Sequence, residues 1–207
     1  MGGMLKVGRA LFFLGLVLAI VGFFRPWIPH ASVALVVTGF ELDEFAWLFP
    51  QVQSGAVALT RGLFLLPVTA AAVLLGLGIA RLPVRWWVRL IPLGFAVTLA
   101  LVPLPPYEVL QDPRYRLRMI LAIIGPLLVL LTPLARRFPL GLWTSLVALA
   151  AVVGIVPAVI QYVRLRPAVV ALYGTSFGPG WGLIACGAGF VLLLAASWLL
   201  NRDPTTK

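Results

Sequence analysis

The densest group of side chains able to do chemistry lies in a polar segment in the middle of the chain. Arginines and tyrosines alternate there with two acids: Tyr107, Glu108, Asp112, Arg114, Tyr115, Arg116 and Arg118. Guanidinium groups bind phosphate and carboxylate groups through paired hydrogen bonds, and tyrosines favour the depth of lipid headgroups. Arg164 and Arg166, in a later polar segment, are expected nearby. The pattern indicates contact with lipid phosphate or an acidic partner surface, although topology setting and interfacial anchoring account for the same residues.

The only histidine, His30, follows an aromatic turn that contains Trp27. Zinc and haem sites in membrane enzymes normally use two or more histidines, so no metal or cofactor site is predicted. We expect both side chains at the membrane interface, in contact with lipid or with a partner.

Three acids follow shortly after, at Glu41, Asp43 and Glu44. They could bind a divalent cation together with loop carbonyls, but a solvated polar face is the favoured interpretation. The single cysteine, Cys186, lies among glycines and alanines and is expected to be a packing residue. No Gly-x-Ser-x-Gly, P-loop or Ser-x-x-Lys pattern occurs, so no catalytic residue is predicted.

The composition indicates that lipid is the solvent. Hydrophobic residues make up 62% of the 207 residues and charged residues 11%, whereas soluble domains are nearer half apolar and a quarter charged. The net charge of +10 comes from arginines placed singly or in pairs at the ends of apolar runs. That placement fits anionic headgroups, and no nucleic-acid partner is expected.

The apolar runs predict an all-α membrane protein, a bundle of six transmembrane helices forming a single domain. A span needs about 20 residues. The expected spans are residues 10–24, 62–80, 88–104, 119–135, 142–160 and 181–200, with outer loops at 25–61, 105–118 and 161–180. No charged residue lies in the middle of a span, which argues against a pump or an ion-coupled carrier. Hydroxyls such as those of Thr69, Thr98 and Thr132 are expected to bond their own backbone.

Six spans place both termini on one side, with nine Lys and Arg residues against seven on the other. The positive-inside rule therefore predicts cytoplasmic termini. Small residues four apart predict close helix contacts, and they occur as Ala72, Gly76 and Ala80, as Ala150, Gly154 and Ala158, and as the pairs Gly182 with Cys186 and Ala185 with Gly189.

Two outer stretches echo each other at an offset of 137, residues 31–40 and 168–177, which match at six of ten positions. Both are rich in valine and bounded by proline and glycine, as strands are, so we expect them to pair as a small extracytoplasmic cap. A duplicated span–loop–span unit is one hypothesis for this echo. Residues 42–49 alternate acids with Leu42, Phe45 and Phe49, which predicts a short amphipathic helix lying on the membrane.

The first and last units resemble those of many small bacterial multi-span membrane proteins of uncharacterised function. The features are a Phe24-Arg25-Pro26-Trp27 turn after the first span, a strand ending in Thr38-Gly39-Phe40, and a Tyr173-to-Gly182 turn into the last span. The resemblance covers roughly a third of the chain. It implies a helical bundle with an outer β-cap in a bacterial inner membrane, and it implies no activity.

The function expected from the sequence is non-enzymatic, a structural or accessory subunit of a larger membrane assembly. A small transporter or a lipid-handling protein that uses the outer Arg/Tyr surface is the alternative, and a lipid-modifying enzyme comes third. A transporter predicts a polar cavity reaching mid-membrane, and an accessory subunit predicts a tightly packed bundle. An enzyme predicts that His30 and the acids converge within hydrogen-bond reach.

Overall fold

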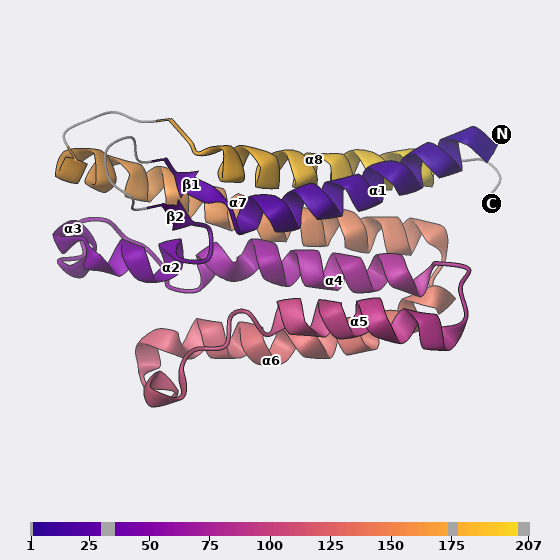
Figure 1. Ribbon diagram of the computed structural model, residues 1–207, viewed down its shortest axis with the longest axis horizontal. Helices are drawn as coiled ribbons and strands as arrows, with labels where there is room; N and C mark the ends of the chain where they lie inside the picture. The colour runs from indigo at the N-terminus through magenta and orange to yellow at the C-terminus, as the bar shows by residue number, and fades with distance from the viewer. Residues whose placement is uncertain (1, 30–35, 174–177, 203–207) are drawn as a thin grey trace.

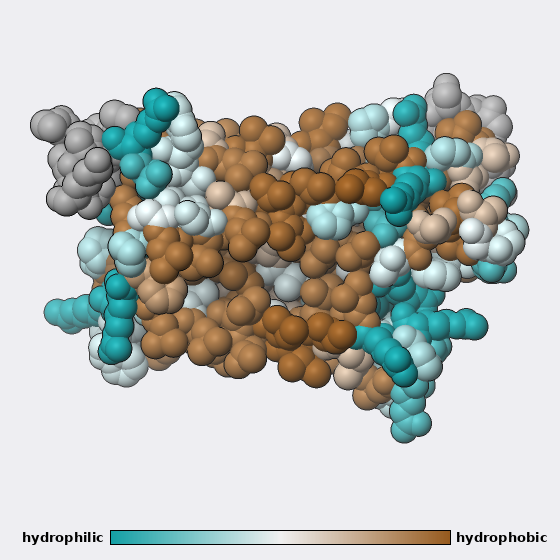
Figure 2. All heavy atoms as spheres, turned by 180° about the vertical axis from the view of Figure 1, so that it is seen from behind, coloured by the Kyte–Doolittle hydropathy of each residue, from teal (hydrophilic) through white to brown (hydrophobic). Residues whose placement is uncertain are grey.

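The computed structural model describes residues 2–29, 36–173 and 178–202. Its helices run back and forth along one long axis, so that α1 begins and α8 ends at the same end of the molecule (Figure 1). We call this the termini end, and the opposite end, which carries the two strands, the cap end. On the face drawn in Figure 2, apolar side chains cover the middle and polar side chains gather at both ends.

Within the described residues, five helical segments are long and apolar enough to cross a membrane. They are formed by α1 (Gly2–Phe23), by α4 (Leu66–Ala80) with the preceding turn η2 (Leu63–Leu65), by α6 (Arg116–Leu131) with its flanking turns η4 (Pro113–Tyr115) and η5 (Thr132–Arg137), by α7 (Leu140–Tyr173), and by α8 (Trp181–Asn201). Length and composition therefore make the chain a multi-span membrane protein.

The third expected span corresponds to a shorter apolar helix, α5 (Trp86–Ala100). Its 15 residues measure about 22 Å, less than the roughly 30 Å of a typical hydrocarbon core. Figure 1 shows α5 running from the termini end toward the cap end beside α4 and α6, and it packs against both. The sequence prediction of 88–104 was wrong at its C-terminal boundary, because the helix ends before Pro103 and turns follow.

The central helix of the bundle is α4, which packs against α1, α5, α6 and α7. Its apolar window is 72% buried, compared with 28% for the window around α6. A helix that is apolar on all sides is expected in this position, since it meets neighbours rather than lipid all round.

Glycines allow α1 and α8 to approach backbone to backbone. A Cβ atom on Gly22 would lie 2.3 Å from the Cys186 nitrogen, and one on Gly189 would lie 2.4 Å from the Ala19 nitrogen. Gly76, another of the small residues expected at helix contacts, meets a side chain instead, because a Cβ there would lie 2.7 Å from the Thr132 hydroxyl oxygen. Such contacts hold helices together where lipid supplies no hydrophobic drive.

The expected second cap strand is wrong, because α7 continues through residues 168–173 as helix. Leu165, Ala168 and Val169 are almost fully buried, so packing of this helical face outweighs the local strand preference. Pro167 lies inside the helix, where neighbouring helices can compensate for its missing hydrogen bond. Residues 174–177 of the expected strand lie outside the described residues.

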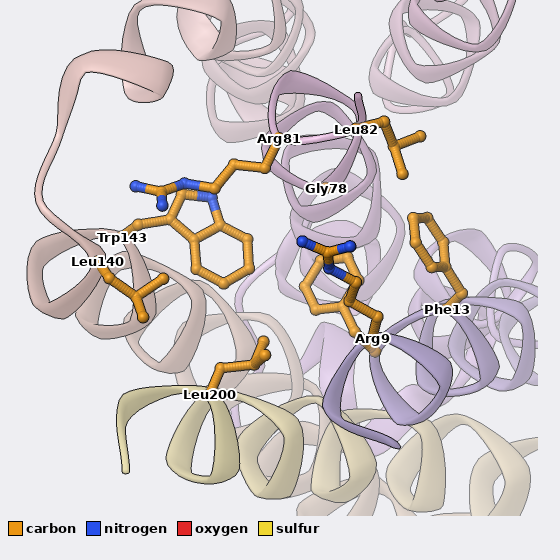
Figure 3. A pocket seen from close by; sticks show the side chains of 9 residues that line it. Arg9, Phe13, Gly78, Arg81, Leu82, Leu140, Trp143 and Leu200 are labelled. Carbon is orange, nitrogen blue, oxygen red and sulfur yellow. The ribbon is translucent and has the colours of Figure 1, made fainter. Parts of the chain in front are cut away.

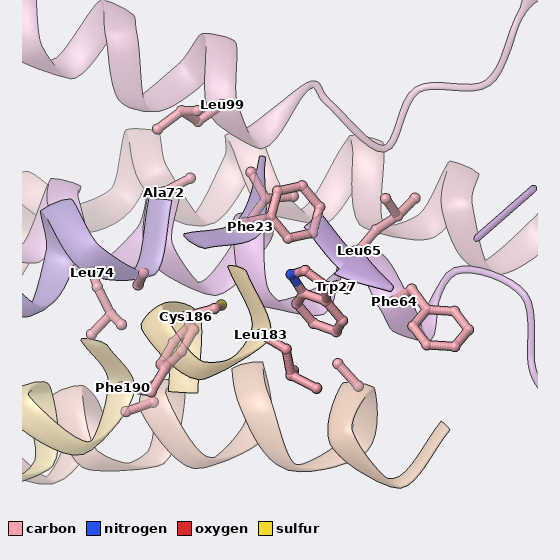
Figure 4. Packing of buried hydrophobic residues seen from close by; sticks show 14 of the residues in the cluster. Phe23, Trp27, Phe64, Leu65, Ala72, Leu74, Leu99, Leu183, Cys186 and Phe190 are labelled. Carbon is pink, nitrogen blue, oxygen red and sulfur yellow. The ribbon is translucent and has the colours of Figure 1, made fainter. Parts of the chain in front are cut away.

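The cap sheet is instead a hairpin within the first loop. Strand β1 (Pro26–Ile28) pairs antiparallel with β2 (Val37–Thr38) in the register Pro26 with Thr38 and Ile28 with Val37, with an irregularity between them. A strand at the end of the first expected stretch, 31–40, is confirmed at Val37–Thr38, and residues 31–35 lie outside the described residues. The Trp27 side chain of β1 packs beside Phe23, Leu65 and Leu183 in the core (Figure 4).

Short helical turns follow the hairpin as α2 (Leu42–Phe45), η1 (Ala46–Leu48) and α3 (Pro50–Gln53), and η3 (Tyr107–Val109) lies in the later cap-end loop. The helical prediction for 42–49 is confirmed, but its apolar side does not lie on the membrane. Leu42 and Phe49 are 0% and 1% exposed and belong to the core. The cap is therefore packed onto the bundle.

Candidate functional site

The cap end contains a buried carboxyl group, which no sequence pattern predicted. Asp43 in α2 is 1% exposed, and its Oδ1 accepts a 2.5 Å hydrogen bond from the backbone N–H of Gly62. Gly62 has a φ of +92°, a left-handed conformation that favours glycine, and a Cβ there would lie 3.2 Å from Leu117. The turn before α4 is thus shaped to bring a backbone donor to this carboxylate.

Arg118, from the first turn of α6, lies beside Asp43 and is itself 4% exposed. Its Nη1 is 3.6 Å from Asp43 Oδ2 and donates to Glu44 Oε1, while its Nε donates to the Pro103 carbonyl at 3.1 Å. One guanidinium therefore joins α2, the turn after α5 and α6.

Glu44 links the buried pair to the surface. Its Oε2 accepts a 3.2 Å hydrogen bond from the Tyr115 hydroxyl and lies 3.7 Å from Arg61 Nη2. The Arg61 guanidinium lies 4.3 Å from the Tyr115 ring centroid and 4.8 Å from that of Trp47, distances typical of cation–π contacts. We call Asp43, Glu44, Arg61, Tyr115 and Arg118 the cap cluster.

Burial raises the pKa of Asp43 to about 6, against the opposing effects of the Gly62 hydrogen bond and the Arg118 guanidinium. Its Oδ2 has no hydrogen-bond partner within the described part of the chain. The cap cluster contains two carboxyl groups and two guanidinium groups, so its formal charges cancel when all four are ionised.

Among the described residues, no group of three or more His, Cys, Asp and Glu side chains is placed to hold a metal ion.

The residues expected to contact lipid or a partner divide into two groups. Tyr115 and Arg118 are brought together, but their charged or polar groups bond within the cap cluster. Arg114 and Arg116 are exposed beside it, and Arg164 and Arg166 are exposed on the cap-end part of α7. His30 lies outside the described residues.

Trp27 is a core residue rather than a surface contact, because it is 0% exposed. Its Nε1 donates a 3.1 Å hydrogen bond to the Gly22 carbonyl at the end of α1, and its ring meets Phe23 and Tyr162 edge-on. The Gly180 N–H donates to its backbone carbonyl at 2.8 Å. Trp27 therefore fastens the hairpin to α1, α7 and the start of α8.

The exposed side of the cap carries a shallow groove of about 370 Å³ beside the cluster. Phe45 and Leu48 give it an apolar wall, and Leu48 is 71% exposed. Glu41 and Glu44 also line it. Glu41 Oε2 accepts a 2.8 Å hydrogen bond from the Thr38 N–H, which orients this carboxylate at the end of β2.

Comparison of the chain with protein families, with curated proteins and with solved structures found no match. No relative therefore supplies a substrate, partner or activity for the cap cluster. Its geometry indicates what it can do: it fixes α2 against the beginnings of α4 and α6, and so holds the groove in one shape.

Proposed function

We propose that this chain is a six-span bacterial inner-membrane protein with cytoplasmic termini, acting as a non-enzymatic structural or accessory subunit of a larger membrane assembly. In this proposal α5 is the sixth crossing and the cap faces outward. The groove formed by Phe45, Leu48, Glu41 and Glu44 is the docking surface for a partner membrane protein.

The observation that carries the proposal is the buried Asp43–Arg118 pair beneath the cap. Burying two charges is costly, and apolar side chains of similar volume often give equal or greater stability. What such a pair can supply is a fixed arrangement of the elements it joins. A surface already held in its binding shape loses less conformational freedom on association, which favours a docking role.

The packing of the spans supports a subunit rather than a carrier. A Cβ on Gly154 would lie 2.5 Å from that of Ala70, so α4 and α7 are in close contact. As expected, the hydroxyls of Thr69, Thr98 and Thr132 donate to carbonyls of their own helices, at 3.1, 3.1 and 2.6 Å. These groups are satisfied without a polar cavity.

The partner segment that fits the groove is apolar and carries a basic residue. Phe45 and Leu48 offer apolar contact, and Glu41 has no ion-pair partner among the described residues. A lysine or arginine on the partner would form an ion pair with the Glu41 carboxylate, while a neighbouring hydrophobic residue would cover Leu48.

The test places a photo-crosslinking amino acid at position 48 in the native membrane. A control at Ile91, which is 79% exposed on α5, reports contacts made in the plane of the bilayer. We expect one membrane protein to co-purify stoichiometrically and to crosslink at 48 but not at 91. Leu48→Glu should weaken this association about tenfold or more. A lone monodisperse protein without a crosslink at 48 would overturn the proposal.

A further inference from the structure

A separate cavity of about 190 Å³ lies at the termini end, among α1, the end of α4, the start of α7 and the end of α8. Arg9 and Arg81 line it together with the apolar side chains of Phe12, Trp143 and Leu200. Figure 3 shows both arginine side chains beside the cavity, with the Trp143 ring and Leu200 lining its other parts.

The apolar wall is held in place by its own contacts. Trp143 Nε1 donates a 3.2 Å hydrogen bond to the Leu77 carbonyl, and the Phe12 ring lies 5.7 Å from the Trp143 ring. Phe12 fits against Gly78, where a Cβ would lie 2.5 Å from the phenyl ring. The cavity is therefore formed before any ligand arrives.

The Arg81 guanidinium is only partly satisfied. Its Nη2 donates to the Phe138 carbonyl at 2.6 Å and the group lies 5.3 Å from the Trp143 ring centroid, but its Nε is buried with no hydrogen-bond partner among the described residues. Burial also lowers the pKa of Arg81, because the charged form is desolvated. An anion in the cavity would offset the cost of desolvating this charge.

No carboxylate within the described ranges lies at this end. Five of the six acids fall between residues 41 and 112, at the cap end, and the sixth, Asp203, lies outside the described residues. A second pocket, of about 270 Å³, shares Arg81 with Arg89 and Arg136. Cationic groups therefore converge on Arg81 from both sides, without a described counter-charge.

We infer that the cavity between Arg9 and Arg81 binds the phosphate headgroup of an anionic phospholipid in the leaflet at the termini end. Arginine pairs recognise phosphate oxygens through directed, charge-assisted hydrogen bonds. The apolar wall of Phe12, Trp143 and Leu200 suits the glyceryl and first acyl carbons, and the chains extend into the bilayer. Basic pockets between helices near the membrane surface are suited to such headgroups. The inference is independent of the docking function of the cap.

The test uses the whole chain, purified in a neutral detergent and supplied with phosphatidylglycerol or with phosphatidylcholine of the same acyl composition. Native mass spectrometry counts the retained lipids, and thermal unfolding reports their stabilisation. We expect preferential retention of one phosphatidylglycerol. Arg9→Gln should weaken it about fivefold or more, whereas Arg85→Gln, which removes the same charge at the same end without lining the cavity, should leave it unchanged.

Arg9 is exposed, so its substitution tests the site without disturbing the fold. Arg81→Lys, which keeps the charge but removes the planar fork, should also weaken retention. Equal binding of the two lipids, or an equal loss in Arg9→Gln and Arg85→Gln, would overturn the inference. Stabilisation by inorganic phosphate alone, as strong as that by phosphatidylglycerol at the same concentration, would overturn the assignment to a lipid and identify a soluble anion.

Discussion

At the residue scale, Asp43 is a carboxyl group buried at an energetic cost. It is almost fully buried, one oxygen accepts a backbone hydrogen bond, and the other faces Arg118 without forming one. Desolvation therefore outweighs the favourable contacts, and the pKa rises from its ordinary value of 3.8 to about 6. The carboxyl group consequently titrates within a range accessible to experiment.

This shift predicts that stability depends on pH through Asp43. Between pH 3.8 and 6 the folded protein binds more protons at this carboxyl than the unfolded chain does, so the unfolding free energy falls as pH rises through that window. The shift corresponds to at most about 3 kcal/mol. Asp43→Asn, which stays neutral and keeps an acceptor for Gly62, should be similar to the wild type near pH 4 and more stable near pH 8. Thermal unfolding in detergent measures this.

The matched control is Glu108→Gln, because Glu108 is an exposed acid at the same end of the molecule and lacks the backbone hydrogen bond that Glu41 accepts from Thr38. Its unfolding free energy, plotted against pH, should run parallel to that of the wild type. Parallel curves for Asp43→Asn as well would contradict the role assigned to Asp43.

The sequence predicted Tyr115 and Arg118 as a site but not their partners. Asp43 and Arg118 lie 75 positions apart, and no local pattern specifies which acid meets which arginine across that distance. The one relevant signal in the sequence is charge complementarity. An acidic stretch and an arginine-rich stretch are both expected on the same side of the membrane, where they could pair. Burial of Asp43 was not predictable, because three acids in four residues usually indicate a solvated face.

At the element scale, the pairing of α1 with α8 depends on glycines, which have no side chain to keep the two helices apart. Gly22 and Gly189 bring the two backbones within a distance that any Cβ would block. Close approach maximises dispersion contacts between helices, which is the main attraction available in lipid. The association of α1 with α8 is therefore stabilised mainly by the close fit of their surfaces.

Gly22→Ala should consequently destabilise the protein by about 1–3 kcal/mol, because the new methyl group has no room and the helices must separate. Gly94→Ala is the control. No neighbouring atom of the described residues lies within 4 Å of a Cβ built there, so this change should be neutral or stabilise helix α5 by up to about 1 kcal/mol. Unfolding in a denaturing detergent compares the two, and equal losses would show that packing at Gly22 is unimportant.

Apolar runs flanked by arginine or tryptophan were enough to predict α4 and α8 within a few residues. The continuation of α7 through Pro167 was not predictable in this way. Its valines and its proline are typical of an extended loop, whereas in the structure Leu165, Ala168 and Val169 are buried and α7 packs against η2, α4 and α8. Tertiary contacts therefore determine that this part of α7 is helical.

At the scale of the whole molecule, the proposed six-span topology depends on α5, the one crossing in it that is shorter than the five long apolar helices of the described residues. Its apolar helix is short, but local thinning of the bilayer accommodates a short span at modest cost. We therefore predict that Arg85→Cys and Arg114→Cys, placed at opposite ends of α5, react with a membrane-impermeant maleimide from opposite sides. The buried Cys186 of the parent protein should stay unlabelled. Labelling of both positions from one side would show that α5 does not cross.

The closest helix pair in this bundle also sets an order of events during synthesis. Phe23 and Trp181 are separated by 158 positions, so α1 enters the membrane long before its partner exists. At typical elongation rates this interval is roughly 10–30 s. The glycine face of α1 meets only lipid or transient neighbours during that time. Completion of the fold must therefore follow translation of α8, and until then the close-packing face of α1 lacks its native partner.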